Sequence, residues 1–174
     1  MIDRKEKILQ TALRLFANHG YNGVSTNKIA SEAEVSEGLI FRHYKNKQGL
    51  LDAILQQAFE KAAILYADII TEQDPKQVLW KSITLPFRGD PKEYDFWRLQ
   101  FKLKWELEIS GKEKMQPMTD KLTWAFTQLG YQEPEKEAQI LQHIIESVSG
   151  GILKDGMASQ EALKDFLLEK YRVN

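Results

Sequence analysis

The residues best suited to contact a polyanion gather between residues 36 and 47 of this 174-residue chain. Arg42, Lys45 and Lys47 supply positive charge, and Gly38 lets another surface come close because it has no side chain. Arginine and lysine hold phosphates, while side chains of a helix in the major groove of DNA read the base edges. This segment therefore predicts contact with double-stranded DNA.

Residue types that carry catalysis or bind metals are sparse. The chain has no cysteine, which excludes disulfides, thiolate zinc sites and thiol nucleophiles. Its three histidines, His19, His43 and His143, are far apart in the sequence, and the pair His143 and Glu146 makes no closed metal site. We therefore expect no catalytic residues, no metal and no cofactor, and a protein that is not an enzyme.

Helices must position the cationic segment. Apolar residues recur at spacings of three and four in the first stretch, namely Ile8, Leu9, Ala12, Leu15 and Phe16. Ser25 and Ser36 are expected to cap two short helices joined by residues 34–36, and Asn46 to cap a long helix running to about residue 72. Two short helices with so tight a connection predict a helix-turn-helix.

The helical pattern continues to the end of the chain. No stretch alternates with a period of two over the length of a strand, so we predict about nine helices and no sheet. Pro75, Pro91, Pro117 and Pro134 each fall where a helix could begin, a position that tolerates the missing N–H. The predicted fold class is all-α.

Three segments closely resemble the DNA-binding domain of the TetR family of bacterial transcriptional regulators: ILQTALRLFANHGY at 8–21, VSTNKIA at 24–30 and VSEGLIFRHYKNKQGLL at 35–51. Beyond them the resemblance is architectural, because the family continues into a variable helical domain that binds a ligand and dimerises. The resemblance implies an N-terminal helix-turn-helix DNA-binding domain at 1–46 and a C-terminal helical effector-binding and dimerisation domain at 47–174.

The resemblance also implies which positions contact DNA. Thr26 and Lys47 match phosphate-contacting positions. The positions that face the major groove or its walls are matched by Gly38, Phe41, Arg42 and His43. The candidate DNA-binding residues are Thr26, Lys28, Ser36, Glu37, Gly38, Phe41, Arg42, His43, Lys45 and Lys47.

Two of these positions depart from the family pattern. Position 41 is usually tyrosine, and Phe41 lacks the hydroxyl that would reach a phosphate, although its ring can lie against a thymine methyl. Position 37 is often basic or small, whereas Glu37 would repel nearby phosphates. Its carboxylate either accepts a hydrogen bond from cytosine or stabilises the helix N-terminus, and the second interpretation is favoured.

Aromatic residues are concentrated in the larger, C-terminal part of the chain. Trp97, Phe101 and Trp105 recur at every fourth residue of a helix expected over about 91–110. Core packing accounts for any one ring, whereas a group of rings also suits a cavity for an apolar or planar effector. The candidate pocket residues are Trp80, Trp97, Phe101, Trp105 and Trp124.

A helix expected over about 134–154 carries apolar residues on more than one stripe, which indicates one face for the core and one for a partner. In the family, the corresponding helix and the last one form a four-helix bundle with a second copy. The candidate dimer residues are Ile140, Ile144, Ser147, Val148, Gly151, Leu163, Phe166 and Leu167. A broad monomer core is the alternative.

Charge and composition complete the prediction. Residues 1–47 carry a net charge of +3 and the remainder −4, so only the basic part is suited to DNA. The longest apolar run, 62–67, is far shorter than the roughly 20 residues that cross a bilayer, and the N-terminus predicts no secretory signal. We expect a cytoplasmic, nucleoid-associated bacterial protein with no membrane partner.

Together these observations predict a ligand-responsive transcriptional repressor that binds a palindromic DNA operator as a homodimer and is released by an unknown small-molecule effector. Two alternatives remain open. One is a helical regulator without a ligand, and the other is a helical effector-binding or enzyme domain that does not bind DNA.

Overall fold

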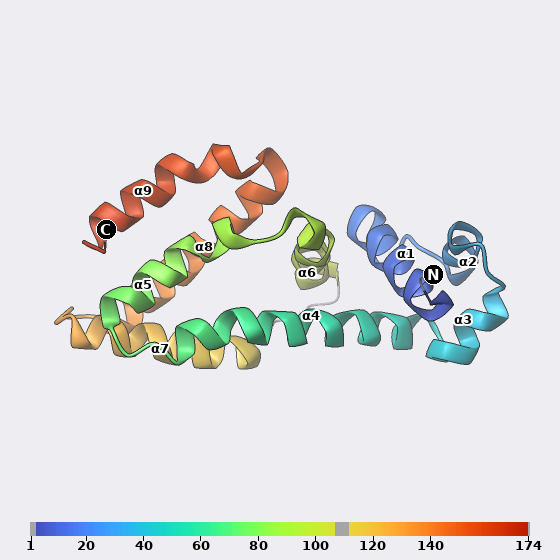
Figure 1. Ribbon diagram of the computed structural model, residues 1–174, viewed down its shortest axis with the longest axis horizontal. Coiled ribbons are helices and arrows are strands. Elements are labelled where there is room, and N and C mark those ends of the chain that lie inside the picture. Colours follow the sequence, from blue (N-terminus) through green and yellow to red (C-terminus); the bar gives the residue numbers. More distant parts are fainter. Residues whose placement is uncertain (1–2, 107–111, 174) are drawn as a thin grey trace. The chain divides into compact units, whose positions relative to one another are not determined.

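The computed structural model describes residues 3–106 and 112–173, with the side chains of Trp105 and of residues 112–114 left outside the description. Nine α-helices and three short 3-10 helices occupy these ranges, with no strand among them, which confirms the all-α prediction (Figure 1). The α-helices are α1 (Arg4–His19), α2 (Thr26–Ala33), α3 (Glu37–Tyr44), α4 (Lys47–Ile70), α5 (Pro75–Thr84), α6 (Tyr94–Glu106), α7 (Lys112–Gln128), α8 (Pro134–Asp155) and α9 (Glu161–Lys170). The 3-10 helices are η1 (Leu85–Arg88), η2 (Pro91–Glu93) and η3 (Met157–Gln160).

The chain forms two compact units. The head unit comprises Met1–Ala62 and Lys92–Ile109, and the body unit comprises Ala63–Pro91 and Ser110–Asn174. This division differs from the expected border between residues 46 and 47, because the head unit also includes the first part of α4 and the whole of α6.

The head unit has one hydrophobic core around α1. Ile8, Leu15 and Phe16 are fully buried there, and the ring of Phe16 meets that of Tyr21 edge to face at 5.2 Å. The same core takes in residues from α2, α3, α4 and α6, namely Ile29, Ile40, Leu50, Leu51, Ile54, Leu99 and Leu103. Leu99 and Leu103 explain why α6 belongs to the head, although some 80 residues separate it from α1 in sequence.

Side-chain caps fix where the helices of the head begin. The Ser25 hydroxyl accepts from the backbone N–H of Lys28 at 3.1 Å, and that of Ser36 accepts from Leu39 at 3.3 Å. The Asn46 side chain accepts from the N–H of Gly49 at 2.8 Å at the start of α4. All three predicted caps are confirmed, and each satisfies a backbone donor that the first helical turn leaves free.

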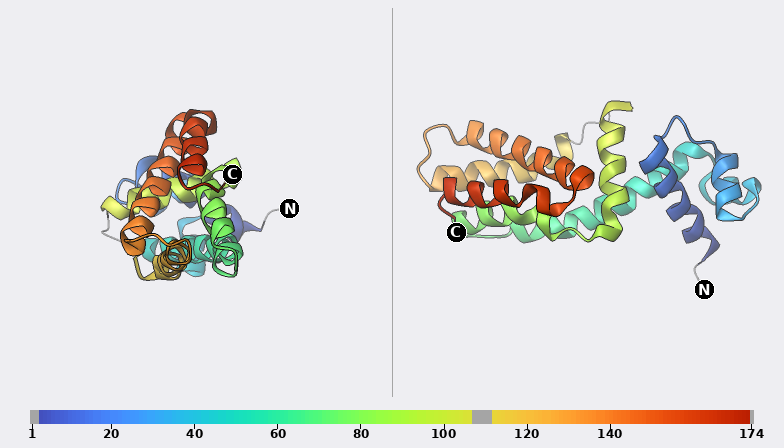
Figure 2. Two further views of the ribbon diagram at one scale, coloured as in Figure 1. Left: turned by 90° about the vertical axis from the view of Figure 1, so that its left-hand side faces the viewer. Right: turned by 90° about the horizontal axis from the view of Figure 1, so that it is seen from above.

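The body unit is a helical bundle of α5, α7, α8 and α9, together with the end of α4 (Figure 2). Its core is separate from that of the head and centres on Leu79, Leu122, Phe126 and Leu141, which are fully buried. Pro117 was expected to begin a helix, but it lies inside α7, which starts five residues earlier. That expectation is therefore wrong. Proline removes one backbone hydrogen bond from α7, and the helix tolerates this loss.

Lys81 of α5 joins two carboxylates of the body unit. Its ammonium lies 2.7 Å from the carboxylate of Asp68 and 2.8 Å from that of Glu72. The hydrogen bond from Lys81, followed by those from the N–H groups of Asp74 and Gln73, lowers the pKa of Glu72 to about 2. The hydrogen bond from Lys81 also lowers the pKa of Asp68.

Replacing Lys81 by methionine should therefore change how stability depends on acid. A carboxyl with a depressed folded-state pKa stabilises the fold above its ordinary pKa and loses that contribution as pH falls. We expect the melting temperature of Lys81→Met to be below that of the parent at neutral pH and to converge with it between about pH 4.5 and pH 2. Thermal melts across this range check the prediction. The control is Lys76→Met, which replaces an exposed lysine on the same helix. Melting temperatures of the parent and of Lys81→Met that change in parallel with pH would contradict the prediction.

Candidate DNA-binding surface

Helix α3 is anchored to the head by its inner face. Ile40 is fully buried and Tyr44 is nearly so, four residues further along the same face. The Tyr44 hydroxyl donates to the backbone carbonyl of Lys5 at 2.9 Å, which ties the end of α3 to the start of α1. Burial, followed by the nearby carboxylates of Glu6 and Asp3, raises the pKa of Tyr44 to about 12, so the phenol keeps its proton at neutral pH.

The opposite face of α3 is open to solvent. Gly38, Arg42 and His43 are exposed, and Phe41 exposes 44% of its surface despite its apolar ring. A Cβ atom placed on Gly38 would meet nothing within 4 Å. This side of α3 is therefore accessible to a DNA groove, as the helix-turn-helix prediction requires.

Two basic residues of the head, away from α3, are paired with carboxylates. Lys7 lies 2.6 Å from Glu34, and Arg14 lies 2.6 Å from Glu32. Among the ion pairs of the described residues, none engages a lysine or arginine of the predicted DNA-binding set. That set includes Lys28, Arg42, Lys45 and Lys47. Cations without carboxylate partners are available to neutralise phosphates.

Lys47 occupies a defined place at the first residue of α4. Its ammonium lies 4.2 Å from the centre of the Tyr21 ring, and the Tyr21 hydroxyl donates to the side chain of Gln48 at 3.1 Å. A cation over an aromatic face is held in position while its charge stays available. Lys47 is therefore oriented at the start of a helix, where backbone N–H groups also favour anions.

Thr26 and Glu37 are joined directly. The Thr26 hydroxyl, on the first residue of α2, donates to Oε1 of Glu37, on the first residue of α3, at 2.6 Å. Both side chains are half-buried. The sequence did not predict this bond, because the two residues are eleven positions apart and meet only through the angle at which α2 and α3 cross.

The predicted pocket aromatics fall in both units. Trp80 and Trp124 pack half-buried against the body core, and Lys121 lies 4.0 Å over the ring of Trp124. Trp97 and Phe101 lie on α6, in the head unit. The side chain of Trp105 lies outside the described part of the chain, so the aromatic cavity stays a prediction.

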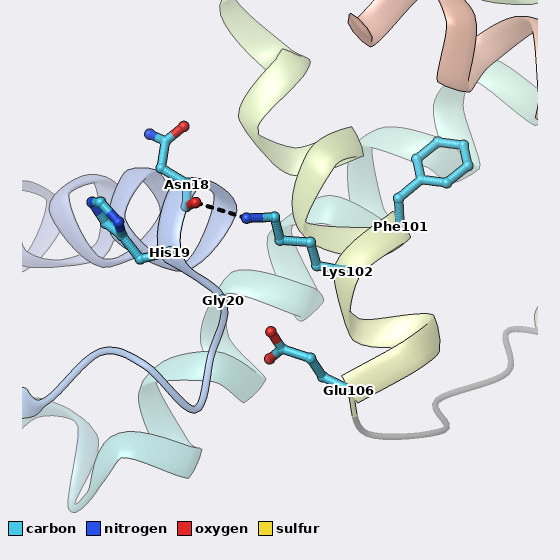
Figure 3. Close-up of a pocket in the computed structure, with 6 residues that line it drawn as sticks. All are labelled: Asn18, His19, Gly20, Phe101, Lys102 and Glu106. Atoms are coloured by element: carbon cyan, nitrogen blue, oxygen red, sulfur yellow. Dashed lines mark hydrogen bonds between the residues drawn. The ribbon is translucent and has the colours of Figure 1, made fainter.

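Phe101 lines a shallow cleft of about 450 Å³ at the end of α1 (Figure 3). There Lys102 donates to the carbonyl of Asn18 at 2.7 Å, and Glu106 accepts from the N–H of Tyr21 at 2.9 Å. Gly20 has a φ of 78°, and a Cβ atom on it would collide with the Glu106 carboxylate. The polar groups of this cleft thus hold α6 to α1, and glycine is required between them.

The predicted dimer residues are distributed between the surface and the interior of the body unit. Ile140, Leu163 and Phe166 are exposed large apolar side chains, and Ser147 is also exposed. The half-buried members are Ile144 and Gly151. Val148 and Leu167 are buried within the body unit, so we expect them to pack beneath a dimer interface rather than to contact the partner directly.

The described ranges 3–106 and 112–173 contain neither a candidate metal site nor a helix able to cross a membrane. No group of three or more histidine or acidic side chains is placed there to hold a metal ion. None of the described helices combines the length and the apolar character that crossing a membrane requires.

The head is similar to known bacterial regulatory proteins. Residues 8–54 match the family model described as bacterial regulatory proteins, tetR family. The uncharacterized transcriptional regulator YuxN of Bacillus subtilis is 31% identical over 103 residues, which cover 59% of this chain and 35% of that protein. The transcriptional repressor AcnR of Corynebacterium diphtheriae is 33% identical over 87 residues, which cover 50% of this chain and 44% of that protein.

The matched segments span about a third of the length of the first curated relatives. A solved structure covers more: a transcriptional regulator from Saccharomonospora viridis, in complex with choline, aligns over 95% of both chains with a TM-score of 0.74 and 22% identity. At that identity the likeness establishes a shared fold. Through residues 8–54, which include its helix-turn-helix segment, the chain is similar to the TetR family of bacterial regulatory proteins.

Proposed function

We propose that this protein is a transcriptional regulator that binds duplex DNA through the outer face of α3. The observation that carries the proposal is the open face of Gly38, Phe41 and Arg42, flanked by cations that have no carboxylate partners in the described structure. The inner face of the same helix is fixed by Ile40 and Tyr44. A rigid helix with one open, cationic side is suited to the major groove.

The proposal includes binding as a homodimer at a palindrome. A helix-turn-helix dimer places its two recognition helices about one turn of DNA apart, roughly 34 Å, or a multiple of this spacing. The exposed apolar side chains of Ile140, Leu163 and Phe166 support an interface on α8 and α9. Association surfaces of proteins commonly contain such exposed large apolar side chains.

We also propose that a small-molecule effector acts on the body, and that the protein is a repressor released by it. Half-buried Trp80 and Trp124 support an aromatic binding region, since such rings suit apolar or planar ligands. The name of the relative AcnR supports repression, and the choline complex of the Saccharomonospora viridis protein supports ligand binding by this fold. Such a regulator would act in the cytoplasm, and the relatives are named as regulators rather than enzymes.

The test is a salt-dependent titration of the duplex that the parent protein selects from random sequences. Arg42→Ala and Lys47→Ala should each weaken binding about tenfold, and Lys47→Ala should lower the salt slope by about 1 for each lost phosphate contact. Arg14→Ala is the control, because Arg14 is paired with Glu32 and such an exposed pair contributes little to stability. Parental affinity in both test variants would rule out α3 and the start of α4 as the contact surface.

A further inference from the structure

Thr26 and Glu37 are both predicted DNA-contacting residues, and they are bonded to each other. The Thr26 hydroxyl donates to Glu37 Oε1 at 2.6 Å, which is short for such a bond and typical of a hydroxyl bound to a charged oxygen. Within the described residues, no other hydrogen bond or ion pair engages the Glu37 side chain. One carboxylate oxygen is therefore held, and the second remains available.

The bond limits what Thr26 can do on DNA. A hydroxyl group has a single proton, and a DNA phosphate accepts hydrogen bonds but does not donate them. While the Thr26 proton is committed to Glu37, the hydroxyl has nothing to donate to a phosphate. A phosphate contact through the Thr26 hydroxyl is thus incompatible with this arrangement.

The bond also defines what Glu37 can read. A carboxylate offers only acceptors, and the donors exposed in the major groove are the amino groups of cytosine and adenine. Adenine presents its N7 acceptor beside the amino group and would repel a carboxylate, whereas cytosine offers its amino group without a neighbouring acceptor on the same base. The matching base is therefore cytosine.

We propose that Glu37 determines specificity by accepting a hydrogen bond from a cytosine amino group in each half-site, and that Thr26 is the positioning residue that holds its carboxylate. This inference rests on the proposed DNA-binding function. Gly38, whose missing side chain leaves open space next to Glu37, allows the groove to approach the carboxylate. The negative charge of Glu37 also disfavours sites that lack this cytosine, because no hydrogen bond there offsets its repulsion by the phosphates.

The test uses the duplex that the parent protein selects, with each C·G pair changed in turn to T·A. Thymine places the O4 acceptor where cytosine has its amino donor. We expect one pair per half-site at which the parent loses about tenfold or more in affinity, and we expect Glu37→Gln to lose the discrimination at that pair alone.

Variants of Thr26 separate positioning from phosphate contact. Thr26→Val removes the hydroxyl and should reduce discrimination at the same pair while keeping affinity for the other duplexes within a few-fold. Thr26→Ser keeps a hydroxyl and should restore the discrimination. A uniform loss of affinity in Thr26→Val, with base preference unchanged, would instead indicate a phosphate contact and overturn the inference.

The outcomes distinguish this inference from the function on which it rests. Specific binding by the parent without a preference for cytosine at any position overturns the role of Glu37 and leaves the proposed function standing. Failure of the parent to bind any duplex at low salt overturns both. Thermal melts of every variant show that the comparison is made between folded proteins.

Discussion

Gly38→Leu is expected to weaken operator binding by about two orders of magnitude while the free protein folds normally. A Cβ atom at this position meets nothing within 4 Å, so the free head has room for a larger side chain. On DNA the same side chain would stand between α3 and the groove. We expect operator affinity to fall by roughly 100-fold, which corresponds to about 2.7 kcal/mol.

Gly38→Ala distinguishes this explanation from a loss of stability. Alanine in a helix is favoured over glycine by roughly 0.5–1 kcal/mol, so this variant should melt above the parent while binding more weakly. The two effects have opposite signs, and general damage to the fold cannot produce them together. The measurements are thermal melts and binding titrations, with Gln77→Leu on α5 as an exposed control in the body. Parental affinity in Gly38→Leu would show that α3 does not enter a groove.

Phe16→Ala and Phe126→Ala should each destabilise one unit by about 3–5 kcal/mol. Both rings are fully buried; Phe16 packs against Tyr21, and Phe126 against Tyr131 and Tyr171 at 5.0 and 5.5 Å. The loss combines the transfer of a large apolar group with the cavity that alanine leaves. Because the two rings belong to separate cores, each substitution should destabilise a different set of helices.

Hydrogen exchange measured by mass spectrometry locates that damage. Phe16→Ala should expose the amides of α1, α2 and α3 and abolish DNA binding, whereas Phe126→Ala should expose those of α5, α7 and α8 first. Phe41→Ala is the matched control, because its ring is 44% exposed and its loss should change stability by no more than about 0.5 kcal/mol. If both core variants lost protection evenly along the chain, the two cores would unfold as one cooperative unit.

The parts of the fold that local chemistry controls could be predicted from sequence. Ser25, Ser36 and Asn46 each bind the backbone N–H three residues further along, so the caps and the helix-turn-helix follow from neighbouring residues. The inner face of α3 was predictable for the same reason, since Ile40 and Tyr44 lie one helical turn apart.

The remainder depends on how helices cross. The bond from Thr26 to Glu37 and the packing of α6 on α1 join residues that no local pattern links. Pro117 shows a related limit: a helix can also contain proline in its interior at the cost of one backbone hydrogen bond, so proline alone does not fix where a helix begins. The assignment of Trp97 and Phe101 to the head unit also required the packing of Leu99 and Leu103 to be known.

The attachment of α6 to the end of α1 uses main-chain atoms of the head rather than its side chains. Lys102 binds the carbonyl of residue 18, and Glu106 binds the amide of residue 21. Every amino acid except proline offers the same amide, and every one offers the same carbonyl. These two bonds would therefore survive most exchanges at either position. Exchange of Asn18 should therefore leave the attachment of α6 intact, whereas exchange of Tyr21 would keep the amide bond but lose the ring contacts with Phe16 and Lys47.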